Sequence, residues 1–397
     1  MSAVESTRAE TQRRRGWEER LLKSILLPHK KLVGRCCNEY DLLSLTLRGI
    51  IKRDMDNPEG KFPASFETYQ EVNPGDFVFC MFDNEETPRA VGLSGLRGMI
   101  TGAYDVMSLI DDGISPEFLN YYFLWIDDGK RLKPLYKGLR KTVPLDSFLS
   151  FKIPLPPLPE QKEIVAYLDA ETRRIDKAIA AEEKMIALLQ ERREIVICEA
   201  MAAREGWVEK YGKCIFSENK RKNRALDQET VLSLSYGKIV VKKSRAEGLV
   251  PAEYSSYQVL SPSNIVVRCT DLQNDQNSLR IGYVEDCGII TSAYLGLIVN
   301  DGFYPKFVFY CLHAWDVSKE IYRYGSGLRQ SLSWADFKYL RLSFPSLPEQ
   351  EEIVKRLDAE TGKIDRAIEV KRRQIELLRE RRQIVIDEAV TGKVKVA

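Results

Sequence analysis

Two stretches of the chain carry the same long pattern of hydrophobic and polar positions. After Pro159, no Gly or Pro interrupts the first stretch up to about residue 203, and its apolar residues recur at steps of three and four. This spacing is typical of a helix with one apolar face. At 1.5 Å per residue, about 44 residues form a rod of roughly 65 Å. The second stretch begins at residue 347 and predicts a second helix of the same kind.

The apolar positions of each predicted helix line up along one seam, which is typical of a coiled coil. The seam residues are Ile164, Leu168, Ile175, Ile179, Ile186, Leu189 and Val196 in the first helix, and Ile353, Leu357, Ile364, Ile368, Ile375, Leu378 and Val385 in the second. A helix that buries one stripe needs a partner, and the other copy in the same chain can provide it. We therefore predict an antiparallel coiled coil about a pseudo-two-fold axis.

The two helices belong to an internal repeat that spans the chain. Leu158-Pro159-Glu160-Gln161 recurs 189 residues later as Leu347-Pro348-Glu349-Gln350. Residues 158–200 align without a gap to residues 347–389, with about 27 identities in 43 positions. Fainter matches continue upstream, such as Gly138-Leu139-Arg140 with Gly327-Leu328-Arg329. The chain therefore contains two copies of a globular part followed by a long helix.

The two helices have stayed alike, whereas the two globular parts have diverged. This contrast indicates that the helices share one task while each globular part recognises something different. The alternative is that long helices with heptad-like patterns tolerate less change.

Each globular part mixes short strand-like runs with one helix that begins at a proline. The strand-like runs cover residues 42–47, 77–82, 265–268 and 289–299, and the helices follow Pro116 and Pro305. The mixture predicts an α+β fold. We expect a globular domain at 1–157, a long helix at 158–205, a second globular domain at 206–346, and a second long helix with a tail at 347–397.

The composition is that of a folded protein and points to no metal chemistry. Hydrophobic residues make up 44% and charged residues 30%, and 60 Lys and Arg against 58 Asp and Glu leave a net charge of +2. The chain has two histidines, His29 and His313, and its cysteines form no Cys-x-x-Cys pair. The sequence therefore predicts no metal site. No run approaches the length of a membrane span, and the start of the sequence lacks the apolar stretch of a secretory signal. We therefore expect a cytoplasmic protein with reduced cysteines and no membrane partner.

Lys and Arg gather in clusters although the net charge is near zero. Arg53 and Lys242 occupy equivalent positions of the repeat, and Lys243 and Arg245 lie beside Lys242. A further cluster comprises Lys220, Arg221, Lys222 and Arg224. Such side chains neutralise phosphates and read guanine edges, so they indicate double-stranded DNA as the partner. A solvated surface explains any single cluster equally well.

A glycine-containing loop in each globular part is a second candidate for DNA contact. The loops read Tyr324-Gly325-Ser326-Gly327-Leu328-Arg329-Gln330 and Tyr136-Lys137-Gly138-Leu139-Arg140-Lys141. Glycine allows a loop to turn tightly and to approach a ligand backbone closely. Ser326, Arg329 and Gln330, with Arg140 and Lys141 in the other copy, are base- or phosphate-contacting residue types. An ordinary glycine turn with exposed polar residues is the alternative.

Sequence motifs for catalysis are absent. The chain has no P-loop, no G-x-S-x-G and no Asn-Pro-Pro-aromatic run of amino-methyltransferases. Glu182-Glu183-Lys184 and Glu369-Val370-Lys371 have the spacing of a nuclease Glu-x-Lys, but both lie in the heptad helices. We expect no catalytic residue in this chain.

The repeated helices resemble those of the specificity subunit of type I restriction-modification systems. The resemblance rests on the LPEQ-x-EIV-x-x-LD-x-ET start, the ERR-x-IVI-x-EA end, the tail at 388–393 and the Gly-Ser-Gly-Leu-Arg-Gln loop, within a duplicated plan that covers essentially the whole chain. It implies two target-recognition domains, at 1–157 and 206–346. Each would grip one half of a bipartite DNA sequence, and the two helices would hold them apart as a ruler.

The same resemblance implies partners. Two methyltransferase subunits would use S-adenosylmethionine to methylate adenine, and two restriction subunits would translocate and cut DNA with ATP and Mg. These cofactors are expected only on the partners, and this chain is expected to be a non-catalytic specificity subunit. A coiled-coil scaffold that displays two divergent protein-binding domains stays open as the alternative.

The charges near the middle of the helices lead to a prediction about their pairing. The first helix carries Glu182-Glu183 where the second carries Lys371-Arg372, and equivalent residues of an antiparallel pair face each other near the midpoint. Opposite charges there favour the intramolecular pair over pairing between molecules. Reversing Lys371 and Arg372 to Glu should lower the melting temperature or cause misassembly. Thermal unfolding and light scattering test this, and an unchanged melting curve and mass would contradict it.

Overall fold

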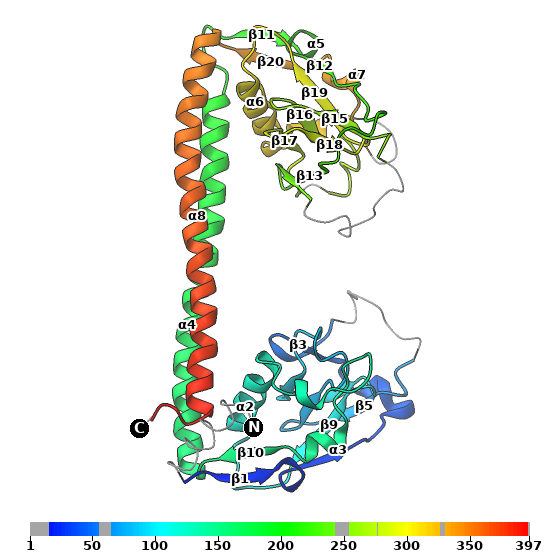
Figure 1. The fold of residues 1–397 in the computed structure, drawn as a ribbon, viewed down its shortest axis with the longest axis vertical. Coiled ribbons are helices and arrows are strands. Elements are labelled where there is room, and N and C mark those ends of the chain that lie inside the picture. The colour runs from blue at the N-terminus through cyan, green and yellow to red at the C-terminus, as the bar shows by residue number, and fades with distance from the viewer. Residues whose placement is uncertain (1–15, 55–64, 243–253, 276, 326–329, 396–397) are drawn as a thin grey trace. The chain divides into compact units, whose positions relative to one another are not determined.

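The computed structural model describes residues 16–54, 65–242, 254–275, 277–325 and 330–395 of the chain (Figure 1). Its contacts group the chain into two compact units. Unit 1 comprises Met1–Glu182 and Gln374–Ala397, and unit 2 comprises Glu183–Arg373. Each unit therefore contains one globular part together with portions of both long helices. No helix within the described ranges is both long enough and apolar enough to cross a membrane.

The two long helices have the predicted length. Helix α4 spans Leu158–Met201 and helix α8 spans Leu347–Val390, with 44 residues each. All the predicted seam residues are buried or half-buried. By contrast, Leu188 and Leu377 lie off the seam and are 50% and 49% exposed. The three- and four-residue spacing therefore identifies the inner face of both helices.

Within each unit, the start of one long helix packs beside the end of the other. In unit 1, Ile164 and Leu168 of α4 share a core with Val385 of α8. In unit 2, Ile353 and Leu357 of α8 share a core with Val196 of α4. An ion pair between the helices is present in each unit: Arg382 Nε lies 3.2 Å from Asp176 Oδ1, and Arg193 Nε lies 3.1 Å from Asp365 Oδ1. These pairs are repeat equivalents, offset by 189 residues.

The globular part of unit 1 is built on a four-stranded antiparallel sheet with the order β2-β9-β6-β7. Its strands are β2 Leu26–His29, β6 Phe77–Phe79, β7 Val91–Leu93 and β9 Asp105–Leu109. Three two-stranded antiparallel sheets accompany it: β1 Glu18–Leu21 with β10 Lys152–Leu155, β3 Leu43–Thr46 with β4 Gly49–Lys52, and β5 Gln70–Val72 with β8 Gly98–Ile100. The helical elements are α2 Pro116–Asp128, α3 Leu145–Leu149 and the 3-10 turns η1 Leu22–Ser24, η2 Gly34–Glu39 and η3 Lys133–Leu135.

The globular part of unit 2 has the same strand order, β12-β19-β16-β17. These strands are β12 Phe216–Glu218, β16 Ile265–Val267, β17 Ile281–Tyr283 and β19 Leu295–Val299. The smaller sheets are β11 Val208–Tyr211 with β20 Arg341–Phe344, β13 Leu232–Ser235 with β14 Lys238–Val241, and β15 Gln258–Leu260 with β18 Gly288–Ile290. The helical elements are α5 Gly212–Ile215, α6 Pro305–Val317, α7 Trp334–Phe337 and the 3-10 turn η4 Glu320–Arg323.

The predicted helices after Pro116 and Pro305 are present, and two strand predictions need correction. The run predicted at 77–82 is a strand only over Phe77–Phe79. The run at 289–299 is two strands, β18 and β19, because a turn closes between them with Tyr294 N–H donating to the Thr291 carbonyl at 3.3 Å. The hydrophobic run hides this turn because Ser292 and Ala293 are small rather than strongly polar. In both units the sheet packs on the proline-started helix, as Phe77 does on Phe123, with ring centroids 5.5 Å apart.

The repeated LPEQ and LD-x-ET motifs join each long helix to its globular part. Gln161 is buried, its amide donates to the Pro156 carbonyl at 2.8 Å, and its Oε1 accepts from Ser115 N–H at 2.8 Å at the start of α2. Gln350 makes the equivalent bonds to Pro345 at 3.0 Å and Tyr304 at 2.9 Å.

The aspartates of the motif add a second bond at each junction. Tyr121 donates to Asp169 and Tyr310 to Asp358, each at 2.7 Å. Burial raises the pKa of Tyr121 to about 12, so this phenol remains a donor at neutral pH. These contacts explain why the motif recurs, because they fix the helix to the globular part within each unit.

Candidate nucleic-acid interface

The loop at residues 136–142 of unit 1 forms a closed, exposed turn. Lys137 N–H donates to the Thr142 carbonyl at 2.8 Å, and Thr142 N–H donates back to Lys137 at 3.0 Å. Gly138 at the start of the tip has φ 67°, which glycine adopts without strain. Leu139 at the tip is 101% exposed. Arg140 and Lys141 are both exposed on this turn.

Arg140 is held at the base of this turn by a carboxylate and a ring. Its Nη2 and Nε lie 2.6 Å and 3.2 Å from the two carboxylate oxygens of Asp83, and its guanidinium sits 4.8 Å from the centroid of the Phe82 ring. The hydrogen bonds from Arg140 lower the pKa of the Asp83 carboxyl, so the pair is ionised at neutral pH. Asp83 N–H also donates to the Arg140 carbonyl at 2.7 Å. The arginine is therefore pre-oriented but must exchange one carboxylate for any anionic ligand.

The corresponding loop of unit 2 is also bonded to the loop between β16 and β17, but through a different position. Leu272 N–H donates to the Gln330 carbonyl at 3.2 Å, whereas the equivalent Asp83 N–H donates to Arg140, one position earlier in the repeat. Gln330 and Lys141 share a left-handed backbone, with φ 44° and 47°. The Gln330 amide donates to the carbonyls of Tyr322 at 2.7 Å and Tyr324 at 2.9 Å, so its side chain closes the loop. Ser326 and Arg329 lie outside the described residues.

The predicted basic residues Arg53 and Lys242 follow equivalent hairpins. Arg53 comes directly after β4, and its N–H donates to the Leu42 carbonyl at 2.8 Å. Lys242 comes directly after β14, and its N–H donates to the Val231 carbonyl at 3.0 Å. Arg53 is half-buried and Lys242 is exposed. Lys243 and Arg245 lie outside the described residues.

The sequence reasoning missed one basic segment, Lys30 and Lys31 after β2. This segment is equivalent to Lys220 and Arg221, which follow β12 in unit 2. The backbone bonds match: Glu71 N–H donates to the Lys31 carbonyl at 2.8 Å, and Val259 N–H donates to the Arg221 carbonyl at 2.9 Å. The signal was in the sequence, because the two basic pairs are offset by 190 residues, within the range of the repeat.

In unit 1, Lys30 and Arg140 are both exposed cations. Lys30 Nζ donates to the Gly102 carbonyl at 3.1 Å, and the nearby Tyr104 ring lies 6.0 Å from Phe82, on which Arg140 stacks. Arg140 therefore lies over an aromatic ring that itself packs against Tyr104. Cations beside aromatic faces suit a nucleic-acid ligand.

The described residues contain no cluster suited to a metal ion, and Cys269 is buried. No group of three or more His, Cys, Asp or Glu residues among them could hold a metal ion. The cysteines are free thiols, and burial raises the pKa of Cys269 to about 12, which keeps it protonated. Lys30, Lys141 and Lys242 are exposed cations, the side-chain type that neutralises phosphates.

Comparison with known proteins finds similarity to DNA specificity proteins. Residues 98–185 match the profile of the family described as type I restriction modification DNA specificity domain. A protein of Methanocaldococcus jannaschii named as a type I restriction enzyme MjaX specificity subunit is 24% identical over 310 residues, which cover 70% of this chain and 68% of the relative.

Solved structures also resemble this chain. One, from work on complex assembly and conformational transition of the type I R-M system, has a TM-score of 0.67 at 15% identity and covers 95% of this chain and 98% of its own. At that identity the likeness shows a shared fold. The HsdS subunit from Thermoanaerobacter tengcongensis has a TM-score of 0.49 at 15% identity and covers 96% and 97% of the two chains.

The Arg140–Asp83 pair gives a prediction. Asp83→Asn keeps a side chain that tolerates the left-handed backbone, φ 49°, but removes the carboxylate that competes for Arg140. Affinity for a fixed DNA duplex should rise roughly two- to fivefold at low salt, the scale of one exposed ion pair. Gel-shift titration measures it. Asp111→Asn, which breaks the 2.9 Å pair with Arg20 in the same unit, is the control for lost charge. Equal effects of the two variants would argue against a DNA role for Arg140.

Proposed function

Because this chain belongs to the specificity subunits of type I restriction-modification systems, we propose that it recognises a bipartite double-stranded DNA target, one globular part per half-site. The observation that carries the proposal is the contrast between scaffold and loops. The two units share strand order and loop hydrogen bonds, whereas the exposed loop side chains differ. Such a pair of domains suits two different half-sites on one DNA molecule.

In this proposal the long helices act as an antiparallel coiled coil with pseudo-two-fold symmetry that sets the spacer between half-sites. The equivalent ion pairs Asp176–Arg382 and Asp365–Arg193 and the buried seam support this arrangement. The domain division at 1–157, 158–205, 206–346 and 347–397 separates recognition from spacing. The spacer length should then follow the length of the helices.

The chain acts as the recognition component, and chemistry belongs to its partners. Its relatives are specificity subunits, which supports a non-catalytic role. We assign methylation of adenine with S-adenosylmethionine to two docked methyltransferase subunits. We assign ATP- and Mg-dependent translocation and cleavage to two restriction subunits. The complex would act in the cytoplasm, where the DNA is.

Sequencing methylated adenines in the genome of the source organism tests this function. The expected result is a split motif of two short half-sites separated by a fixed length of unspecified sequence. A gel shift with random duplex DNA across a salt series, with and without the cognate methyltransferase subunit, tests binding directly. A chain that binds no duplex under either condition would instead favour a scaffold for protein-binding domains.

Two substitutions separate base reading from phosphate binding. Arg329→Ala should relax specificity in the second half-site, with a cost of about 1–3 kcal/mol for the preferred sequence. Lys242→Ala should weaken binding to all sequences and reduce the salt slope by about 1. Titrations of matched and mismatched duplexes at several salt concentrations measure both effects, and the reverse pattern would refute the assignment.

A further inference from the structure

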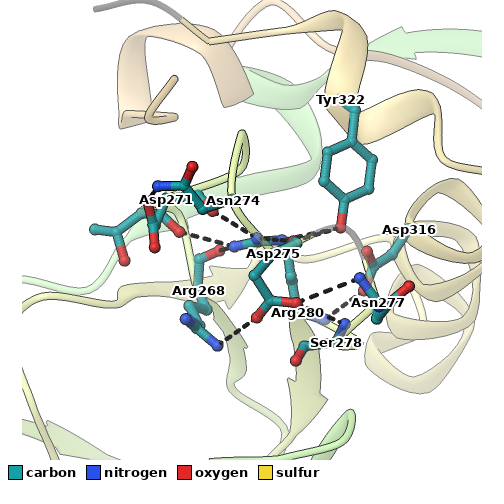
Figure 2. A network of polar contacts seen from close by, with 10 residues as sticks. Arg268, Asp271, Asn274, Asp275, Asn277, Ser278, Arg280, Asp316 and Tyr322 are labelled. Carbon is teal, nitrogen blue, oxygen red and sulfur yellow. Dashed lines mark hydrogen bonds and ion pairs between the residues drawn. The ribbon is translucent and has the colours of Figure 1, made fainter. Parts of the chain in front are cut away.

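Unit 2 contains a buried arginine that organises the loop between β16 and β17. Arg280 is 0% exposed, and its guanidinium donates to the carbonyls of Thr270 at 2.8 Å and Asp271 at 3.0 Å, with a further bond to Asp275 (Figure 2). Its backbone N–H donates to buried Asp316 of α6 at 2.5 Å. A buried guanidinium is stable only when its donors are satisfied, so this loop must keep its carbonyls turned inward.

The same network connects this loop to the Gly-Ser-Gly-Leu-Arg-Gln loop. Arg280 Nε donates to the Tyr322 hydroxyl at 3.2 Å, and that hydroxyl donates to the Asp275 carbonyl at 3.2 Å. The Tyr322 carbonyl accepts from the Gln330 amide at 2.7 Å, and the Gln330 carbonyl accepts from Leu272 N–H at 3.2 Å. The loop between β16 and β17 is therefore bonded to Tyr322 and Gln330.

The outer part of the loop is fixed as well. Figure 2 shows the Asp275 carboxylate between Arg268 and the backbone of Asn277 and Ser278, at 3.1 Å, 3.3 Å and 3.0 Å. The hydrogen bonds from Ser278 are the main reason why the pKa of Asp275 falls to about 2. Asp271 has a left-handed backbone, φ 62°, which a loop without this support would seldom keep.

With its carbonyls inward, the loop exposes amide side chains. Gln273, Asn274 and Asn277 are exposed, and the Asn274 amide donates to Asp271 at 2.8 Å. Asn and Gln are the side chains that bond both N6 and N7 of adenine in the major groove. Gln273 and Asn277 therefore have the chemistry to read adenine.

Unit 1 keeps the scaffold of this arrangement but not its surface. Ala90 stands where unit 2 has Arg280, and its N–H donates to Asp127 at 2.8 Å, as Arg280 does to Asp316. The corresponding loop exposes Glu85 and Glu86 rather than amides. Carboxylates accept from cytosine N4 and cannot make the bidentate contact to adenine. The two loops thus share a backbone contact but expose side chains that suit different bases.

We propose that Gln273 and Asn277 read adenine in the second half-site and that Arg280, through Tyr322 and Asp275, is the positioning residue that presents them. This inference rests on the proposed function and adds to it a specificity-determining element. It assigns unit 2 a half-site that contains adenine at the positions facing this loop.

A selection experiment tests the amides. The full chain, with its methyltransferase subunits, is incubated with a randomised duplex library, and the bound duplexes are sequenced. Gln273→Ala and Asn277→Ala should each reduce adenine preference at one position of the second half-site by about 5- to 150-fold. Gln273→Glu should shift that preference toward cytosine. The first half-site should be unchanged in every variant, and Gln190→Ala, an exposed amide on α4 in the same unit, is the matched control.

The positioning role needs a readout that simple loss of stability would not give. Tyr322→Phe removes the hydroxyl between Arg280 and Asp275 while keeping the ring. It therefore disturbs the fold less than Arg280→Lys, which replaces the buried guanidinium itself. Tyr322→Phe should lower base preference in the second half-site several-fold while affinity for random duplex stays unchanged. A uniform loss of affinity for all sequences would overturn the positioning role.

The outcomes distinguish this inference from the proposed function. A wild-type complex that enriches no split motif overturns both. A wild-type complex that enriches a split motif, with second half-site preferences unchanged in the Gln273 and Asn277 variants, overturns the inference alone.

Discussion

The structure depends on the burial of one apolar stripe on each of two long helices. A helix of 44 residues with one apolar face cannot be stable in water alone, so it must pack its stripe against something else. In unit 1 a single core joins Ile164 of α4 and Val385 of α8 to Phe118 of α2. In unit 2 Ile353, Val196 and Phe307 do the same. Each globular part is thereby fixed to the helices that pass through its own unit.

Buried side-chain amides fix the backbone segments around these cores. The Gln161 and Gln350 amides donate to carbonyls just before α4 and α8. The Gln70 amide donates to two carbonyls of the turn before β9, and the Gln258 amide does the same before β19. Such buried amides must be satisfied, so both copies of the repeat have kept them. The loops beside this frame differ between the units, because Arg140 is exposed whereas Gln330 is half-buried. A constant frame with variable loops is what a protein with two different recognition tasks requires.

The helices could be predicted almost to the residue, because their apolar period extends over many turns and proline marks their starts. The starts of α2 and α6 were predicted for the same reason. The run at 289–299 was predicted as one strand but forms two. The turn between them was missed because Ser292 and Ala293 carry no strong turn signal. Of the residues predicted to contact DNA, Arg140 and Lys242 are exposed and Arg53 is half-buried, and their contact with DNA stays a prediction. Lys30 was overlooked because its cluster is short.

The sequence by itself determined the duplication, the length of the helices, their inner face and the family resemblance, since all four depend on residue identity and spacing along the chain. Only the tertiary structure decided which loop side chains are available. Asp83 engages Arg140, the Gln330 amide closes its own loop, and Arg280 turns inward to hold carbonyls from residues 268–275. These partners are distant in sequence or are backbone groups without a sequence signature. Whether a charge binds a ligand or holds a loop therefore depends on the fold around it.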